Sequence, residues 1–295
     1  MNYDKNTHCY TYKKRTFSDP LLPSVDATYI IHLENNGRLP DIEEQLRRFH
    51  PTREVFIVYN KGYKKCDKSL KQNDTTHDLK DANLNILQHS IDNNYSTILI
   101  LEDDFQFSDE ILSKNTSDEV NRFLMKNRDN EMIYYLGCIP IVNYFTSLNH
   151  VRILVSLGMH ACIFTHPVKD RVMKNVEKIL DWDVYINSNP FIPRYRYKTP
   201  LCYQIFPPTE NQSNWKTLVY FGDYLFMLAM SIFSKLGIDK QPEPGYTQAY
   251  YISYFLSYIG VFVLLYLIYK FFLSSFQLIN SLKKPGMRLL KRITK

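Results

Sequence analysis

Three consecutive carboxylates, Glu102, Asp103 and Asp104, carry the strongest chemical signal in this sequence. They directly follow the apolar run 97–101, which predicts a strand buried on both faces. Neighbouring carboxylates repel one another and are costly to bury alone, so their position calls for a compensating charge. A divalent cation such as Mn²⁺ or Mg²⁺, shared with a substrate phosphate, is the simplest one. The alternative is a strand that ends in an ordinary acidic turn or helix start.

The elements that must position these carboxylates are alternating strands and helices. This β-α-β-α-β order predicts a doubly wound sheet flanked by helices. Such sheets bind ligands beyond the carboxyl ends of their strands, where the triplet lies. The first strands are expected at 26–33, 54–59 and 97–101, and the first helices at 42–49, with Asp41 as a cap, and at 78–93.

Further elements are predicted after the triplet. We expect helices at 110–125 and 168–180, a strand at 131–139, and one or two strands within 151–164, interrupted near Gly158. The stretch 181–215 is rich in Pro, Tyr and Asn and shows little periodicity. We expect it to be an irregular, functional loop.

Composition limits the classes of protein that fit. The chain has 295 residues, of which 45% are hydrophobic and 22% charged, as in a globular protein. It has nine glycines and neither a GxGxxG nor a GxxxxGK[ST] motif, so phosphate chemistry would depend on a metal and side chains. The net charge is +6, but seven basic residues and no acidic one follow from Lys270 onward, which leaves −1 for the rest. A nearly neutral domain argues against nucleic acid as a partner.

The five cysteines are Cys9, Cys66, Cys138, Cys162 and Cys202. Their number is odd and they lack CxxC spacing, so we expect neither a disulfide framework nor a zinc site, and we favour a reducing compartment. Glycosylation sequons at Asn73, Asn94, Asn115 and Asn211 arise easily in an Asn-rich chain and do not place the domain in a lumen.

The C-terminal part predicts a membrane anchor. Residues 250–269 are uncharged, apolar residues continue to 273, and aromatic residues lie at both ends, as in a transmembrane helix. The alternative is a buried core helix. The shorter apolar segment 224–233 is expected to lie at the interface or to be re-entrant.

The expected organisation therefore has five parts. They are a polar N-terminal extension (1–25), a catalytic domain (26–217), an amphipathic membrane-proximal segment (218–248), a transmembrane helix (249–273) and a basic tail (274–295). The extension has no apolar signal segment. The anchor is either a single C-terminal pass or a membrane hairpin, and we expect the catalytic domain to be cytoplasmic.

The triplet Glu102–Asp104 resembles the acidic DxD-like motif of GT-A glycosyltransferases. The strand 29–33 with its Arg-containing turn, and the helix 78–93 that leads into 98–104, resemble glycosyltransferase family 25 across residues 26–215. The Asn-, Lys-, Ile- and Tyr-rich composition is similar to glycosyltransferases of large DNA viruses. This resemblance implies a GT-A-like mixed sheet, a nucleotide-sugar donor, a Mn²⁺ or Mg²⁺ cofactor, and a hydroxyl acceptor on a glycan, protein or lipid.

The resemblance also implies roles for particular residues. The metal would bind Asp104, with Glu102 or Asp103 assisting and His160 as a further candidate, and the Glu in first position leaves the division of metal and ribose roles open. An inverting transfer needs a base, for which Asp183 is our first candidate and Asp181 the second; the alternative is that either caps a turn. The alternative for His160 is an ordinary core residue, and the alternative for Arg38 is an exposed charge in a turn. The expected donor-binding residues are His32, Glu34, Arg38, Glu102 and Asp103, and the expected acceptor-binding residues are Trp182, Gln204, Glu210 and Asn211.

Two other functions compete with a membrane-associated, metal-dependent glycosyltransferase. A non-catalytic, membrane-anchored binding or scaffold module would not need the triplet or the pair Asp181 and Asp183. A metal-dependent phosphohydrolase or nucleotidyltransferase would need a second acidic or His cluster, which the sequence does not show.

Overall fold

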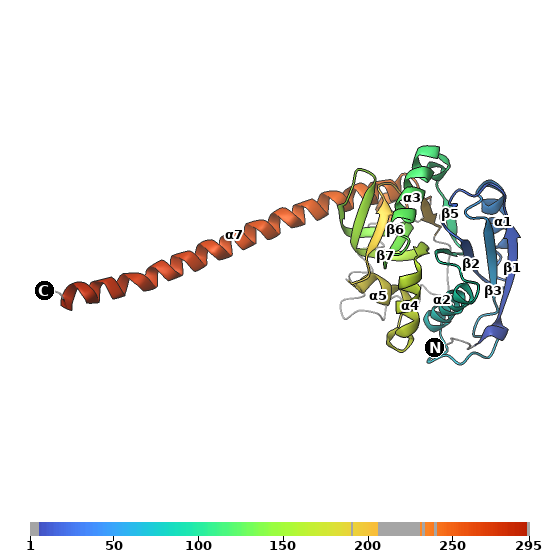
Figure 1. The fold of residues 1–295 in the computed structure, drawn as a ribbon, viewed down its shortest axis with the longest axis horizontal. Coiled ribbons are helices and arrows are strands. Elements are labelled where there is room, and N and C mark those ends of the chain that lie inside the picture. The colour runs from blue at the N-terminus through green and yellow to red at the C-terminus, as the bar shows by residue number, and fades with distance from the viewer. Residues whose placement is uncertain (1–5, 190, 206–230, 232–233, 239–240, 294–295) are drawn as a thin grey trace.

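The computed structural model describes residues 6–189, 191–205, 231, 234–238 and 241–293. Its centre is a seven-stranded mixed sheet with the order β1-β3-β2-β4-β7-β6-β8, and a small second sheet pairs β5 with β9. A long C-terminal helix projects from this globular part (Figure 1). The strands are β1 (Tyr10–Thr16), β2 (Ala27–Leu33), β3 (Glu54–Asn60), β4 (Ile98–Glu102), β5 (Phe105–Phe107), β6 (Ile133–Phe145), β7 (His150–Phe164), β8 (Arg194–Tyr197) and β9 (Cys202–Gln204).

Helices cover both faces of the sheet. One core cluster joins α2, α4 and α5 to one face, and a second joins α1 and α3 to the other. The fold is therefore a three-layer α/β/α arrangement around parallel strands β3, β2 and β4. The helices are α1 (Leu39–Arg48), α2 (Thr75–Asp92), α3 (Lys114–Lys126), α4 (His166–Lys174), α5 (Trp182–Ser188) and α7 (Gly245–Ile293), with 3₁₀ turns η1 (Thr7–Cys9), η2 (Asp109–Leu112) and η3 (Val176–Lys178).

The predicted doubly wound mixed sheet is confirmed, and so are the strands expected at 26–33, 54–59 and 97–101. In β4 the side chains alternate between the two core clusters, so the strand is buried on both faces. Several boundaries differ, among them those of α1 and β7. Helix α1 begins at Leu39, before Asp41, because Pro40 is tolerated in a first turn that needs no N–H. Strand β7 is continuous through Gly158, whose φ of 74° absorbs the irregularity.

Two stretches expected to be irregular contain strands. Within the predicted extension 1–25, β1 pairs antiparallel with β3 at the sheet edge. Its charged residues face solvent, so the sequence has no apolar pattern that would predict a strand. Charged side chains suit an edge strand, because they oppose pairing with a strand of another molecule. Within 181–215, β8 and β9 are four and three residues long, too short for a periodic pattern.

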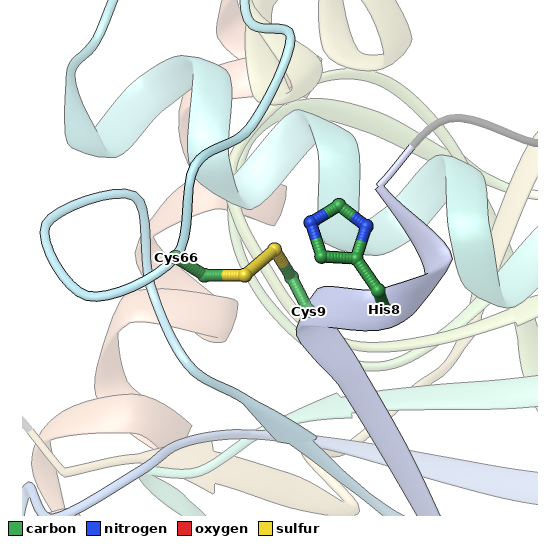
Figure 2. Close-up of side chains that lie close together, drawn as sticks. All are labelled: His8, Cys9 and Cys66. Atoms are coloured by element: carbon green, nitrogen blue, oxygen red, sulfur yellow. A yellow bond between two sulfur atoms is a disulfide. The ribbon is translucent and has the colours of Figure 1, made fainter.

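The expectation of unpaired cysteines was wrong. Cys9 and Cys66 form a disulfide with a Cα–Cα distance of 5.9 Å, which ties η1 to the loop after β3 (Figure 2). Their separation of 57 residues gives no sequence signal, because pairing depends on the fold. Cys138, Cys162 and Cys202 are buried free thiols.

Helix α7 begins as part of the domain. Tyr246, Ala249 and Tyr250 are buried against Ile139 and Tyr203. The following turns expose apolar side chains on all sides, and Gly245–Phe276 is long and apolar enough to cross a membrane, with a mean hydropathy of 2.0. The helix is a candidate membrane anchor. Apart from Ser231, the segment 224–233 lies outside the described residues.

Candidate active site

The acidic triplet lies at the carboxyl end of β4, between strands that bring other polar groups to it. The parallel register pairs Ile31 with Glu102, and the antiparallel register pairs Leu101 with Ala161. His32 and His160 therefore lie on the two strands beside the triplet. The sheet topology assembles this site from segments that are about 60 to 70 residues apart in the sequence.

Asp103 holds the turn between β2 and α1. Its carboxylate accepts hydrogen bonds from the Leu33 N–H at 3.3 Å, from the Asn36 amide and from the Arg38 guanidinium, and His32 Nδ1 lies 3.7 Å away. Burial alone would raise the pKa of Asp103, but His32, Arg38 and Asn36 together lower it. Asp103 is thus a compensated, ionised carboxylate.

Asp104 is only partly compensated. Its Oδ2 accepts a hydrogen bond from Gln204 Nε2 at 3.2 Å and lies 3.7 Å from Arg38, while its Oδ1 is buried without a hydrogen-bond partner. Burial, and next the charge of Asp103, raise the pKa of Asp104 to about 7. Burial, followed by Asp104 and Asp183, raises the pKa of Glu102 well above its ordinary value.

Helix α5 supplies a further carboxylate. Asp181 caps this helix by accepting the Val184 N–H at 2.7 Å, so the capping alternative holds for Asp181. Asp183 Oδ1 is buried without a hydrogen-bond partner, and burial, with the charge of Asp181, raises the pKa of Asp183 to about 7. Since Asp183 also raises the pKa of Glu102, the structure brings it to the triplet.

His160 is fully buried beside the site. Its Nε2 donates to the Cys202 carbonyl at 3.4 Å, and its Nδ1 has no hydrogen-bond partner. Burial lowers the pKa of His160 to about 4, so the ring is neutral at pH 7. A Cβ at Gly137 would lie 2.2 Å from Nε2 and 2.1 Å from the Cys202 carbonyl oxygen, so the ring and β9 require glycine there. A neutral imidazole with a free nitrogen can serve as a ligand or a hydrogen-bond partner.

The remaining predicted residues are placed as follows. Trp182 is 3% exposed and packs against Phe164, so its ring belongs to the core and the idea that it offers a flat face to a sugar was wrong. Glu34 follows β2, where its N–H donates to the Asn60 carbonyl. Glu210 and Asn211 lie outside the described residues.

Two residues of the site were missed by sequence reasoning. Asn36 hydrogen-bonds to Asp103, and the Tyr246 hydroxyl donates to the backbone carbonyl of Gln204, the residue that binds Asp104. Asn36 lies in the turn that drew attention to Arg38, but nothing local marked its amide. Tyr246 had no signal, because it is far along the chain in what read as a membrane-proximal segment.

The donor set fits a hard divalent cation. Asp104 and Asp183 each have a buried carboxylate oxygen without a partner, and Arg38 is bound mainly by Asp103. Within the described part of the chain, three potential ligand atoms lie within 4.8 Å of one another only at His8, Cys9 and Cys66, where the disulfide consumes both thiolates (Figure 2). At the acidic triplet no three ligand atoms of the described residues come that close, so the side chains alone do not form a metal cage, and a Mg²⁺ or Mn²⁺ ion there would be held by one or two carboxylates plus substrate phosphates.

Comparisons with known proteins give only distant similarities. No family model and no curated protein matches the chain. Among solved structures, the protein A197 from STIV is similar over 63% of this chain and 87% of its own, with 10% identity and a TM-score of 0.40. A glycosyltransferase involved in the glycosylation of the major capsid of PBCV-1 is similar over 63% and 96%, with 10% identity and a TM-score of 0.37. An apo UDP-glucose pyrophosphorylase covers 58% and 72%, with 10% identity and a TM-score of 0.32. At these scores, the similarity defines neither family nor activity, and the functional conclusion has to come from the site itself.

Proposed function

We propose that this protein is a membrane-associated, metal-dependent glycosyltransferase that moves a sugar from a nucleotide-sugar donor to a hydroxyl acceptor. One observation carries the proposal: Glu102, Asp104 and Asp183 all have raised pKa values at or beside the carboxyl end of β4, and Asp104 and Asp183 each keep a buried carboxylate oxygen without a hydrogen-bond partner. Clustering uncompensated carboxylates is costly unless a cation joins them. This position is where open α/β sheets bind ligands.

Each group has a distinct role in the proposed reaction. Asp104 and Glu102 would hold Mn²⁺ or Mg²⁺, which when bound would neutralise the departing diphosphate. Asp103 would keep Arg38 and the β2–α1 turn beside the donor, with His32 near the end of β2 and Glu34 directly after it. Asp183 would take the proton of the acceptor hydroxyl. At the same time the acceptor oxygen would bond to the anomeric carbon of the sugar and the bond from that carbon to the diphosphate would break, which inverts the configuration. A pKa of about 7 suits a carboxylate in this role.

The test is calorimetric titration of the full chain in detergent with UDP, GDP and their sugar conjugates, with and without Mn²⁺. Full-length protein is needed because Tyr246 and Tyr250 of α7 belong to a core cluster. We expect Mn²⁺-dependent binding that Asp104→Asn weakens at least about tenfold, the scale of one lost metal contact. Asp129→Asn, at an exposed position, is the matched control and should bind like the wild type.

The same titration separates the competing functions. A folded wild type that binds none of these nucleotides would contradict the proposal and favour a scaffold module. Binding followed by phosphate release, without transfer to an added glycan, protein or lipid acceptor, would favour a phosphohydrolase.

A further inference from the structure

The outer half of the β6–β7 hairpin, residues 141–157, exposes an unusual amount of apolar surface. Its exposed side chains include Ile141, Tyr144, Phe145, Leu148, Val155 and Leu157, with Leu148 at the tip 91% exposed. Between Met132 and Phe164 the only charged residue is Arg152, whose guanidinium is held by the Tyr195 hydroxyl at 2.9 Å. Contiguous exposed apolar surface of this kind marks a contact site rather than ordinary solvent-facing structure.

Helix α7 leaves the domain along this same hairpin. The Asn143 N–H donates to Ser257 Oγ at 3.0 Å, its side-chain amide donates to Ser253 Oγ at 2.9 Å, and Phe145 stacks on Tyr254 at 4.6 Å. Figure 1 shows α7 departing from the globular part beside β6 and β7. The hairpin therefore lies beside the part of α7 at which the helix leaves the domain.

The length of α7 sets where a membrane would begin. The helix is attached to the domain up to Ser257, so only residues after it are free to enter a bilayer. From Tyr258 to Phe276 the helix rises about 28 Å, which matches a hydrocarbon core of about 30 Å. Lys270 lies six residues before Phe276, about 9 Å of helical rise, and can extend its ammonium group toward the headgroups on that side. A bilayer crossed by α7 thus has its surface at Ser257, beside the hairpin.

We infer that the β6–β7 hairpin is a second membrane contact, whose apolar side chains enter the interface next to α7. The inference rests on the membrane association proposed above. Tyr144 and Phe145 on the hairpin, with Tyr258 on α7, supply exposed aromatic residues typical of that depth. Two attachments, rather than one helix, fix the tilt of the domain against the lipid surface.

This contact has a consequence for the acidic site. The Tyr246 hydroxyl donates to Gln204, and Gln204 donates to Asp104, so the first turn of α7 is linked to the carboxylates. Tyr246 precedes Ser257 by eleven residues, a helical rise of about 16 Å. The site is therefore held close to the lipid surface, where it reaches acceptor hydroxyls presented at the membrane.

The test places an environment-sensitive fluorophore (NBD) at single introduced cysteines of the full chain, reconstituted in phosphatidylcholine vesicles with spin-labelled lipid. The probe positions are Leu148→Cys on the hairpin, Phe262→Cys within the span and Thr16→Cys as the control. Thr16 is exposed on β1, at the opposite edge of the seven-stranded sheet from β6, β7 and β8, and the described free cysteines are buried. We expect lipid quenching at 148 and 262 and none at 16.

Every other pattern contradicts the inference, and each does so differently. Quenching at 262 but not at 148 leaves the anchor standing and removes the hairpin contact. A blue-shifted but unquenched probe at 148 indicates that a second copy of the chain covers the hairpin instead. No quenching at either position removes the membrane association as well. Donor binding, titrated on the same vesicles, separates these outcomes from a failure of the glycosyltransferase proposal.

Discussion

Asp103 and Asp104 are neighbours in the sequence, but their environments shift their pKa values in opposite directions. Asp103 is paired with Arg38 and hydrogen-bonded by Asn36, whereas Asp104 has a buried oxygen without a partner. Asp103 therefore suits a structural role, and the adjacent Asp104 suits the role of a ligand. This separation can be tested by measuring stability and binding on the same variants.

Asp103→Asn is expected to destabilise the protein, because it removes the charge that binds Arg38 and the β2–α1 turn. Hydrogen bonds to charged groups contribute about 1.5–3 kcal/mol, so the free energy of unfolding should fall by about that amount. Asp104→Asn should not lower it, since the replaced charge is disfavoured by burial. Denaturant titration of both variants in detergent checks this. Equal losses of stability would show that the two carboxylates do not differ in role.

Asp183→Asn is expected to reduce kcat about 10²–10⁴-fold, the usual contribution of a general base, while leaving the Kd for the donor nearly unchanged. Asp181→Asn is the comparison, because Asn also caps helices and the Asp181 carboxylate serves as the α5 cap. Its kcat should stay within a few-fold of the wild type. A rate unaffected by Asp183→Asn, or lost equally in both variants, would remove Asp183 from the chemistry.

At the scale of elements, His150 makes the start of β7 sensitive to acid. Its ring stacks on Phe123 with centroids 4.1 Å apart, and its Nδ1 lies 3.1 Å from the Tyr134 hydroxyl. Burial lowers the pKa of His150 to about 4, against an ordinary value of about 6.5. Between these values the unfolded chain binds a proton that the folded chain does not, so stability is lost as the pH falls from about 6.5 to about 4.

His150→Gln should therefore make the melting temperature fall less steeply than in the wild type over that pH range. His166→Gln, at a half-exposed position on α4, is the control and should keep the wild-type slope. Melting curves at pH 4 to 7 give the comparison. Parallel slopes for His150→Gln and the wild type would show that another group governs the acid sensitivity.

The elements differ in how far the sequence predicts them. Strands β2, β3 and β4 were predictable, because a strand that is buried on both faces has a continuous apolar sequence. The apolar sequence of β4 also located the triplet at the carboxyl end of that strand. Strands β8 and β9 were not, because strands of three or four residues leave no period. Asp183 was correctly predicted to lie near the triplet. The prediction that the neighbouring Trp182 exposes its ring was wrong, because α5 directs the indole into the core. The Gln204–Tyr246 contact depends on tertiary packing alone.

At the scale of the whole molecule, two features bear on the orientation in a membrane. The Cys9–Cys66 disulfide persists most readily in an oxidising compartment. The basic tail, residues 274–295, has only basic charges, which favour the cytoplasmic side. With α7, the one candidate span among the described residues, between them, both features favour a domain outside the cytoplasm, opposite to the orientation that the sequence led us to expect.

This orientation predicts the state of the cysteines in the full chain made in eukaryotic cells. Under denaturing, non-reducing conditions, a maleimide reagent should label three thiols, those of Cys138, Cys162 and Cys202, and after reduction it should label five. Cys9→Ser frees Cys66 and should give four labelled thiols without reduction.

In intact microsomes, protease should remove the tail and spare the domain. The exposed sequons at Asn73, Asn94 and Asn115 should then carry glycans, which Asn→Gln at each position removes in turn. Five free thiols with a digested, unglycosylated domain would instead place the domain in the cytoplasm. The membrane hairpin expected from the sequence would then be the arrangement that keeps the basic tail on the same side.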